Sequence, residues 1–190
     1  MSVDRSGVRR ANPVTVIRTG RLELEVLDLE RIDALLATPT GWPDDDVDHL
    51  RRWRGLAVDD GGSSAWRARS VTTRDGTIVG HVGFHGRPVP LDEALADPTF
   101  VGIIDSSDSG AVEVGYTIFE SFRRRGYALE AVAALLRWAE STGQVGAVIA
   151  CVEPRNAASR AVLDRLGGFT RIGTCSDDGT DELVFRRNLT

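Results

Sequence analysis

The chain has 190 residues, which is enough for one domain with a sizeable core and too few for two. Hydrophobic residues make up 42% and charged residues 27%, and the formal net charge is −5, a globular composition that disfavours general nucleic-acid binding. No stretch is long and apolar enough to span a bilayer, and the two cysteines lack C-x-x-C spacing, so we expect no membrane partner, no zinc site and a cytoplasmic location.

The predicted elements follow an α/β order. Residues 1–12 are polar and basic and are predicted as a disordered tail, which leaves residues 13–190 as a single domain. Alternating or continuous apolar runs predict seven strands, at residues 21–27, 65–72, 77–84, 111–119, 147–152, 169–174 and 182–188. Apolar spacings of three and four predict four helices, one capped by Asp28, two at residues 44–56 and 127–142, and one capped by Asn156 that ends at Gly167-Gly168. The connections in the C-terminal half favour parallel pairing, so we expect a mixed sheet.

The start of the longest predicted helix has an unusual charge. Arg123, Arg124 and Arg125 run straight into Gly126-Tyr127-Ala128, although a helix start carries partial positive charge and free N–H groups and favours acidic residues. A bound polyanion, most simply a pyrophosphate or phosphate, explains the cluster, and the small Gly126 and Ala128 let the backbone approach it. The alternative is a solvated basic patch.

The strand, turn and helix of residues 113–139 contain R-x-x-G-x-A at Arg123, Gly126 and Ala128, and Asn156-Ala157-Ala158-Ser159 leads into Leu166-Gly167-Gly168-Phe169. Together these motifs resemble the GNAT superfamily of acyl-CoA-dependent N-acyltransferases, and more closely its ribosomal-protein-alanine (Rim-type) N-acetyltransferase branch. The resemblance covers most of the chain, from Arg18 onward. It implies an α/β GNAT fold with a mixed central sheet of about seven strands, splayed central strands and helices on both faces.

The resemblance also implies acetyl-CoA as co-substrate and no metal. In such proteins the turn matched here by Arg123, Arg124, Arg125, Gly126, Tyr127 and Ala128 holds the pyrophosphate of coenzyme A. The strand matched by Thr117, Ile118 and Phe119 pairs its backbone with the pantetheine arm, and the residue matched by Asn156 contacts that arm from the next helix. Asn156 also fits a plain N-cap, and the two roles are compatible.

Acetyl transfer to an amine requires a base that removes the ammonium proton and protonation of the leaving thiolate. Glu113 is the first candidate for the base, and a plain cross-strand charge partner is an equally open role for it. Many GNAT enzymes have a tyrosine seven residues after the position of Asn156, acting as general acid, but this chain has Leu163 there. Ser159 is the alternative donor, and a thiolate leaves well enough that an acid is not strictly required.

The predicted activity is transfer of an acetyl group to a primary amine, either a protein N-terminus or a small amine, by a monomer or homodimer. The connection at residues 85–110 is longer than the Rim-type branch usually carries, and we expect it to shape acceptor choice. The acidic residues Asp44, Asp45, Asp46 and Asp48 favour a helix start, and a second role is the steering of a cationic acceptor.

Two rival functions remain at this point. One is a catalytically silent acyl-CoA-binding sensor or scaffold, which predicts binding without thiol release. The other is a nucleotide-binding protein, which the absence of any lysine and of G-x-G-x-x-G counts against. His81 and His85 are four residues apart on a predicted strand, a spacing that does not favour a metal pair; either could line the acceptor site.

Overall fold

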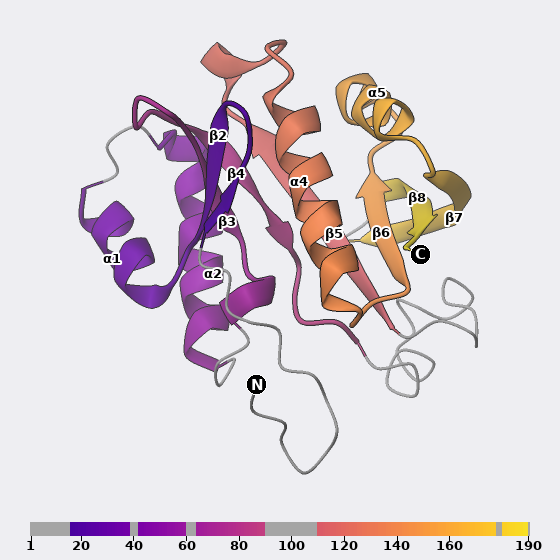
Figure 1. Ribbon diagram of the computed structural model, residues 1–190, viewed down its shortest axis with the longest axis horizontal. Helices are drawn as coiled ribbons and strands as arrows, with labels where there is room; N and C mark the ends of the chain where they lie inside the picture. The colour runs from indigo at the N-terminus through magenta and orange to yellow at the C-terminus, as the bar shows by residue number, and fades with distance from the viewer. Residues whose placement is uncertain (1–15, 39–41, 60–63, 90–109, 178–179, 190) are drawn as a thin grey trace.

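The computed structural model describes residues 16–38, 42–59, 64–89, 110–177 and 180–189 (Figure 1). The predicted tail at residues 1–12 and most of the 85–110 connection lie outside these ranges. The strands are β1 (Val16–Arg18), β2 (Leu22–Val26), β3 (Arg69–Thr73), β4 (Ile78–Phe84), β5 (Ala111–Ile118), β6 (Ala147–Val152), β7 (Thr170–Asp177) and β8 (Thr180–Asn188). The α-helices are α1 (Leu29–Ala37), α2 (Val47–Asp59), α4 (Tyr127–Thr142) and α5 (Ala157–Leu166). Short 3₁₀ helices are η1 (Asp44–Asp46), η2 (Ser64–Trp66) and η3 (Glu120–Phe122).

All eight strands belong to one mixed sheet of order β1-β2-β3-β4-β5-β6-β8-β7. Every neighbouring pair is antiparallel except β5 and β6, which are parallel and are connected through α4. This confirms the predicted mixed α/β fold, in which a parallel pair needs a crossover helix. The sheet has one strand more than the seven predicted, because β1 is only three residues long and lies before the first clear alternation.

Most predicted boundaries are confirmed, and the exceptions have local causes. Helix α4 has the predicted limits because Gly126 and Gly143, both with positive φ, flank its apolar run. The strand predicted from residue 65 begins only at Arg69, since Ser64–Trp66 forms a 3₁₀ turn that buries Trp66. The helix predicted from residue 44 opens with the 3₁₀ turn η1 before α2 begins at Val47.

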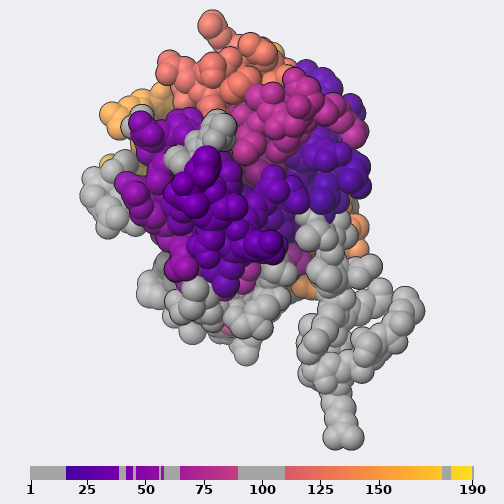
Figure 2. Space-filling view, turned by 90° about the vertical axis from the view of Figure 1, so that its left-hand side faces the viewer, coloured from indigo at the N-terminus to yellow at the C-terminus, as the bar shows by residue number. Residues whose placement is uncertain are grey.

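Helices cover both faces of the sheet (Figure 1). Helix α4 packs on one face, and its buried residues include Leu135 and Trp138. Helices α1 and α2 cover the other face around Ile32, Leu50 and Trp42. In Figure 2 their indigo and violet surface faces the viewer, and the salmon-coloured segment before α4 projects above it.

The two cysteines lie on this second face, beside a small apolar cluster of β5, β6 and β8. Cys151 is half-buried, and its Sγ atom lies 4.0 Å from that of Cys175. Both are free thiols, and burial raises the pKa of Cys151 well above its ordinary value.

Across the described ranges, no helix has the length and apolar character that a bilayer crossing demands.

Candidate active site

The parallel strands β5 and β6 separate after a short paired stretch. They pair only over three positions, from Ala111 opposite Ala147 to Glu113 opposite Ile149. Beyond Glu113, β5 remains paired only with β4, and β6 remains paired only with β8. A wedge therefore opens between the two central strands, as the predicted splay requires.

The hydrogen-bond phase of β5 decides which backbone groups face this wedge. The Phe119 N–H donates to Val79 O at 3.0 Å and the Glu113 carbonyl accepts from His85 N at 3.0 Å, so odd-numbered residues of β5 turn their main chain toward β4. Because this pattern alternates along an antiparallel strand, the main-chain groups of Tyr116 and Ile118 point the other way. Of the three predicted backbone partners, Ile118 faces the wedge, whereas Thr117 and Phe119 bond to β4. Tyr116 was not predicted as a backbone partner, although the alternation of main-chain direction along the strand could have indicated it.

The turn before α4 presents free backbone donors. Gly126 is the N-cap residue with φ 80°, in the left-handed region, and it gives no side-chain cap. The first-turn acid Glu130 does not supply one either, since its carboxylate accepts from Thr19 Oγ1 at 2.6 Å and from the Arg21 backbone N–H at 2.9 Å. The N–H groups at the start of α4 therefore remain available to an anion. Arg124 is the one non-glycine residue of the described chain with positive φ, a costly conformation that functional turns tolerate.

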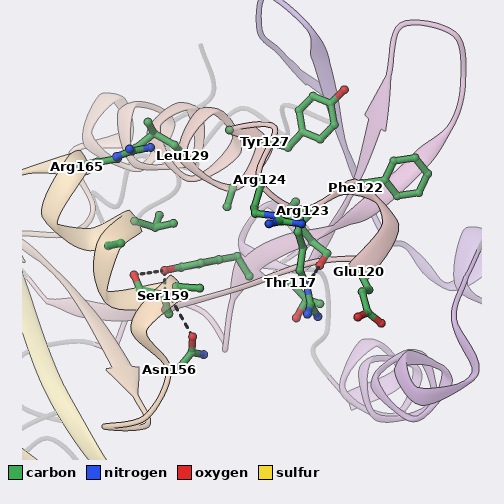
Figure 3. Close-up of a pocket in the computed structure, with 17 residues that line it drawn as sticks. Thr117, Glu120, Phe122, Arg123, Arg124, Tyr127, Leu129, Asn156, Ser159 and Arg165 are labelled. Atoms are coloured by element: carbon green, nitrogen blue, oxygen red, sulfur yellow. Dashed lines mark hydrogen bonds between the residues drawn. The ribbon is translucent and has the colours of Figure 1, made fainter.

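A cleft of about 810 Å³ connects the start of α4 to the wedge (Figure 3). Nine of the predicted site residues line it, which are Thr117, Ile118, Arg123, Arg124, Gly126, Tyr127, Ala128, Asn156 and Ser159. Phe119 is buried at 3% exposure and packs edge-on against Trp42. Arg125 lies outside the lining because its guanidinium donates to Ser121 O and stacks over Phe122. Glu113 also lies outside it, on the sheet face away from α4.

The arginines around the cleft differ in how firmly they are held. Arg123 is fixed, since its Nε donates to the Ile118 carbonyl at 3.0 Å. Arg124 and Arg165 line the cleft from the turn and from α5, and neither guanidinium has a hydrogen-bond or ion-pair partner within the part of the chain that the structure describes. Arg165 was not predicted, because its nearness to the turn is a tertiary feature. These cations make the mouth of the cleft suited to a polyanion despite the negative net charge.

Helix α5 and β5 meet across the cleft through Ser159. The Asn156 Oδ1 accepts from the Ser159 backbone N–H at 3.0 Å, so the predicted N-cap is confirmed. The Tyr116 hydroxyl lies 2.7 Å from Ser159 Oγ and donates to the Ser159 carbonyl at 3.2 Å (Figure 3). Burial raises the pKa of Tyr116 above its ordinary value, which keeps the phenol protonated. Two hydroxyl groups are thus held together beside the wedge.

On the opposite sheet face, two histidines each pair with a carboxylate. His81 and His85 do not act together: His85 Nδ1 lies 3.3 Å from Glu113 Oε2, whereas His81 Nε2 lies 3.4 Å from Asp46 Oδ1. Asp46 Oδ1 is also 3.4 Å from His49 Nδ1, and the Trp42 ring stacks on His81. Asp46 therefore points toward buried histidine, while Asp44 and Asp48 are exposed.

His81 should make stability depend on pH. Burial lowers its pKa from 6.5 to about 4, against the opposing effect of Asp46 and with a small lowering from His49. Between those values the unfolded chain binds a proton that the native state does not, so stability falls as pH drops from 6.5 toward 4, by about 3 kcal/mol in total. Urea titrations across this range measure the loss, and His81→Gln should flatten it. If the stability of the variant fell as steeply with pH as that of the wild type, His81 would not be the source of the pH dependence.

Comparison with known proteins agrees with this geometry. Residues 21–168 match the model of the acetyltransferase (GNAT) domain family. The uncharacterized N-acetyltransferase YjdG of Bacillus subtilis (strain 168) is 26% identical over 168 residues, covering 81% of this chain and 89% of YjdG. A GnaT-family acetyltransferase from Bordetella pertussis shares the fold with TM-score 0.65 and 22% identity, covering 90% of this chain and 98% of that one. RimL, a ribosomal L7/L12 alpha-N-protein acetyltransferase solved with coenzyme A, has TM-score 0.62 and 19% identity, covering 92% and 98%.

The chain belongs to the GNAT acetyltransferase family, and it is an enzyme of the transferase class. Members of this family use acetyl-CoA as the acyl donor. The wedge between β5 and β6 and the glycine turn before α4 are where the resemblance placed that donor.

Proposed function

We propose that this protein transfers the acetyl group of acetyl-CoA to a primary amine in a ternary complex. The observation that supports this most is the cleft itself, which joins free N–H groups and the unpaired Arg124 at the start of α4 to the opening between β5 and β6. The pyrophosphate would lie on Arg123, Arg124 and the N–H groups after Gly126. The pantetheine arm would lie along the backbone of Tyr116 and Ile118 that faces the wedge, much as a peptide adds to a strand edge, with Asn156 on its other side.

The chemistry at the end of the cleft follows from what lies there. A thioester held beside an amine gains most of its rate from proximity and orientation. Ser159 would pass a proton to the departing thiolate, and the Tyr116 hydroxyl 2.7 Å away would hold its Oγ in place. This pair would take the place of the tyrosine that Leu163 replaces. The base would act from the other sheet face, where Glu113 lies at the apex of the wedge.

The acceptor would be a protein N-terminal amine or a small amine. The likeness to RimL, whose name states an alpha-N-protein substrate, supports the first class and the Rim-type branch. The length of the connection after β4 and the acidic residues at the start of α2 support an acceptor surface of this chain's own.

Thiol release tests the proposal. Purified protein with acetyl-CoA should release coenzyme A when given at least one amine from a panel of Ala- and Ser-starting tetrapeptides, spermidine and free amino acids. Calorimetry should show binding of acetyl-CoA that ATP and NAD do not displace. Binding without release for every amine would instead support a silent acyl-CoA sensor, and no binding would refute both.

A further inference from the structure

The imidazole of His85 is held at two points by Glu113. His85 follows the last residue of β4, and its backbone N–H donates to the Glu113 carbonyl at 3.0 Å. Its Nδ1 lies 3.3 Å from Glu113 Oε2. The same two residues are thus joined through both backbone and side chain, which fixes the ring over β5. A proton shared between Nδ1 and the carboxylate leaves Nε2 as the ring atom that accepts another.

Gly115 provides the space for this ring. A Cβ atom at Gly115 would lie 2.5 Å from His85 Nε2 and 3.2 Å from Cδ2, so the imidazole occupies the volume that any larger residue would need. Gly115 is two residues beyond Glu113, where β5 has just separated from β6. Nε2 therefore lies over the apex of the wedge, on the face opposite α4.

Exposure distinguishes the two members of the pair. The His85 side chain is 60% exposed, whereas that of Glu113 is 22% exposed and engaged by the imidazole. An amine that approaches the wedge from this face meets the imidazole before the carboxylate. A carboxylate that holds a histidine in position, with the ring facing the substrate, is an arrangement suited to proton removal.

We propose that His85, rather than Glu113, removes the proton from the acceptor amine, and that Glu113 is a positioning residue for its ring. This inference rests on the proposed acetyl transfer. His85 Nε2 takes one proton from the ammonium group, and the neutral amine attacks the thioester carbonyl. The C–N bond forms and the C–S bond breaks. The second nitrogen proton ends on the coenzyme A sulfur by way of Ser159, and the exposed His85 returns its own to solvent.

The charges around His85 fit a base that works near neutral pH. The hydrogen bond to Glu113 is the largest influence and raises the pKa of His85 above 6.5, and Glu182 from β8 adds to this. Burial and Arg52 from α2 oppose it. A proton acceptor is most effective when its pKa is close to the working pH.

Direct titration tests the pairing without needing an acceptor. In the complex with coenzyme A, ¹⁵N-histidine NMR should give His85 a pKa above its ordinary value in the wild type. The Glu113→Gln variant should give a lower pKa for His85. An unchanged His85 titration would overturn the inference.

The pH dependence of kcat/KM tests the role, using the amine that the wild type turns over best. His85→Gln should lower kcat at least about 100-fold and remove the acidic limb, as loss of a general base does. Glu113→Gln should lower kcat less than His85→Gln does and should move the acidic limb of the profile to lower pH. If His85→Gln stays within a few fold of wild type while Glu113→Gln is inactive, the carboxylate is the base and the inference fails.

A third variant displaces the ring and leaves both partners in the chain. Gly115→Ala should lower kcat about as much as His85→Gln with acetyl-CoA affinity unchanged. Gly86→Ala is the matched control, because a Cβ at Gly86 has no neighbour within 4 Å. Full activity in Gly115→Ala would contradict the placement of Nε2. If the wild type releases no thiol with any amine of the panel, the proposed function fails instead, and the NMR titration still decides the pairing.

Discussion

Replacement of Gly126 by glutamate should abolish binding of acetyl-CoA, lowering its affinity at least about 100-fold, equivalent to about 2.7 kcal/mol. The new carboxylate would lie at the N-terminus of α4, where it would accept from the free N–H groups itself and repel the pyrophosphate. The fold has room for it, since the nearest atom to a Cβ at Gly126 is Arg21 Nη2 at 3.4 Å. The expected loss is therefore one of binding, with only about 1–2 kcal/mol of stability lost to the left-handed backbone.

Gly143 offers a matched control at the other end of the same helix. It also has positive φ, 63° against 80° for Gly126, and a Cβ there has no neighbour within 4 Å. Gly143→Glu thus adds the same charge with the same kind of backbone strain, away from the cleft. Isothermal titration calorimetry should give wild-type affinity for Gly143→Glu and none for Gly126→Glu. Retained affinity in Gly126→Glu would show that the pyrophosphate does not lie at this turn.

The features of the site that could be predicted are those encoded by neighbouring residues. The limits of α4 follow from two glycines around an apolar run, and the N-cap role of Asn156 follows from its place before α5. The arginine cluster points to an anion because helix-start electrostatics is a local property. Which arginine faces the cleft is not local, since it depends on the positive φ of Arg124 and on the Phe122 ring under Arg125.

The features that could not be predicted join residues far apart in the chain. The contact of Tyr116 with Ser159 spans 43 positions and needs α5 to pack beside β5. The pairing of His85 with Glu113 depends on the β4–β5 register, in which Phe84 lies opposite Val114. A strand pattern tells which residues share a face but not which residue of the next strand lies opposite. Both Glu113 and His85 were therefore recognised as candidates, while their partnership was not.

Gly83→Ala should cause the largest loss of stability among the small substitutions considered, about 3 kcal/mol, the upper part of the usual range for overpacking. Gly83 is buried in β4, beside the residues that lead into β3. A Cβ there would collide with the Ala68 Cα and lie 2.9 Å from Ala68 N and 3.1 Å from Arg67 O. These are backbone atoms, so no change of side-chain rotamer relieves the contact.

The strands would have to separate, and the Ala68 carbonyl that accepts from Leu27 N at 2.9 Å would move with them. Thermal unfolding should show a midpoint lower by roughly 6–12 °C, because about 2–4 °C is lost per kcal/mol at this chain length. Gly86→Ala, in open space three residues along the chain, should unfold as the wild type does. A Gly83→Ala midpoint equal to that of Gly86→Ala would mean that β4 and the start of β3 are farther apart than described.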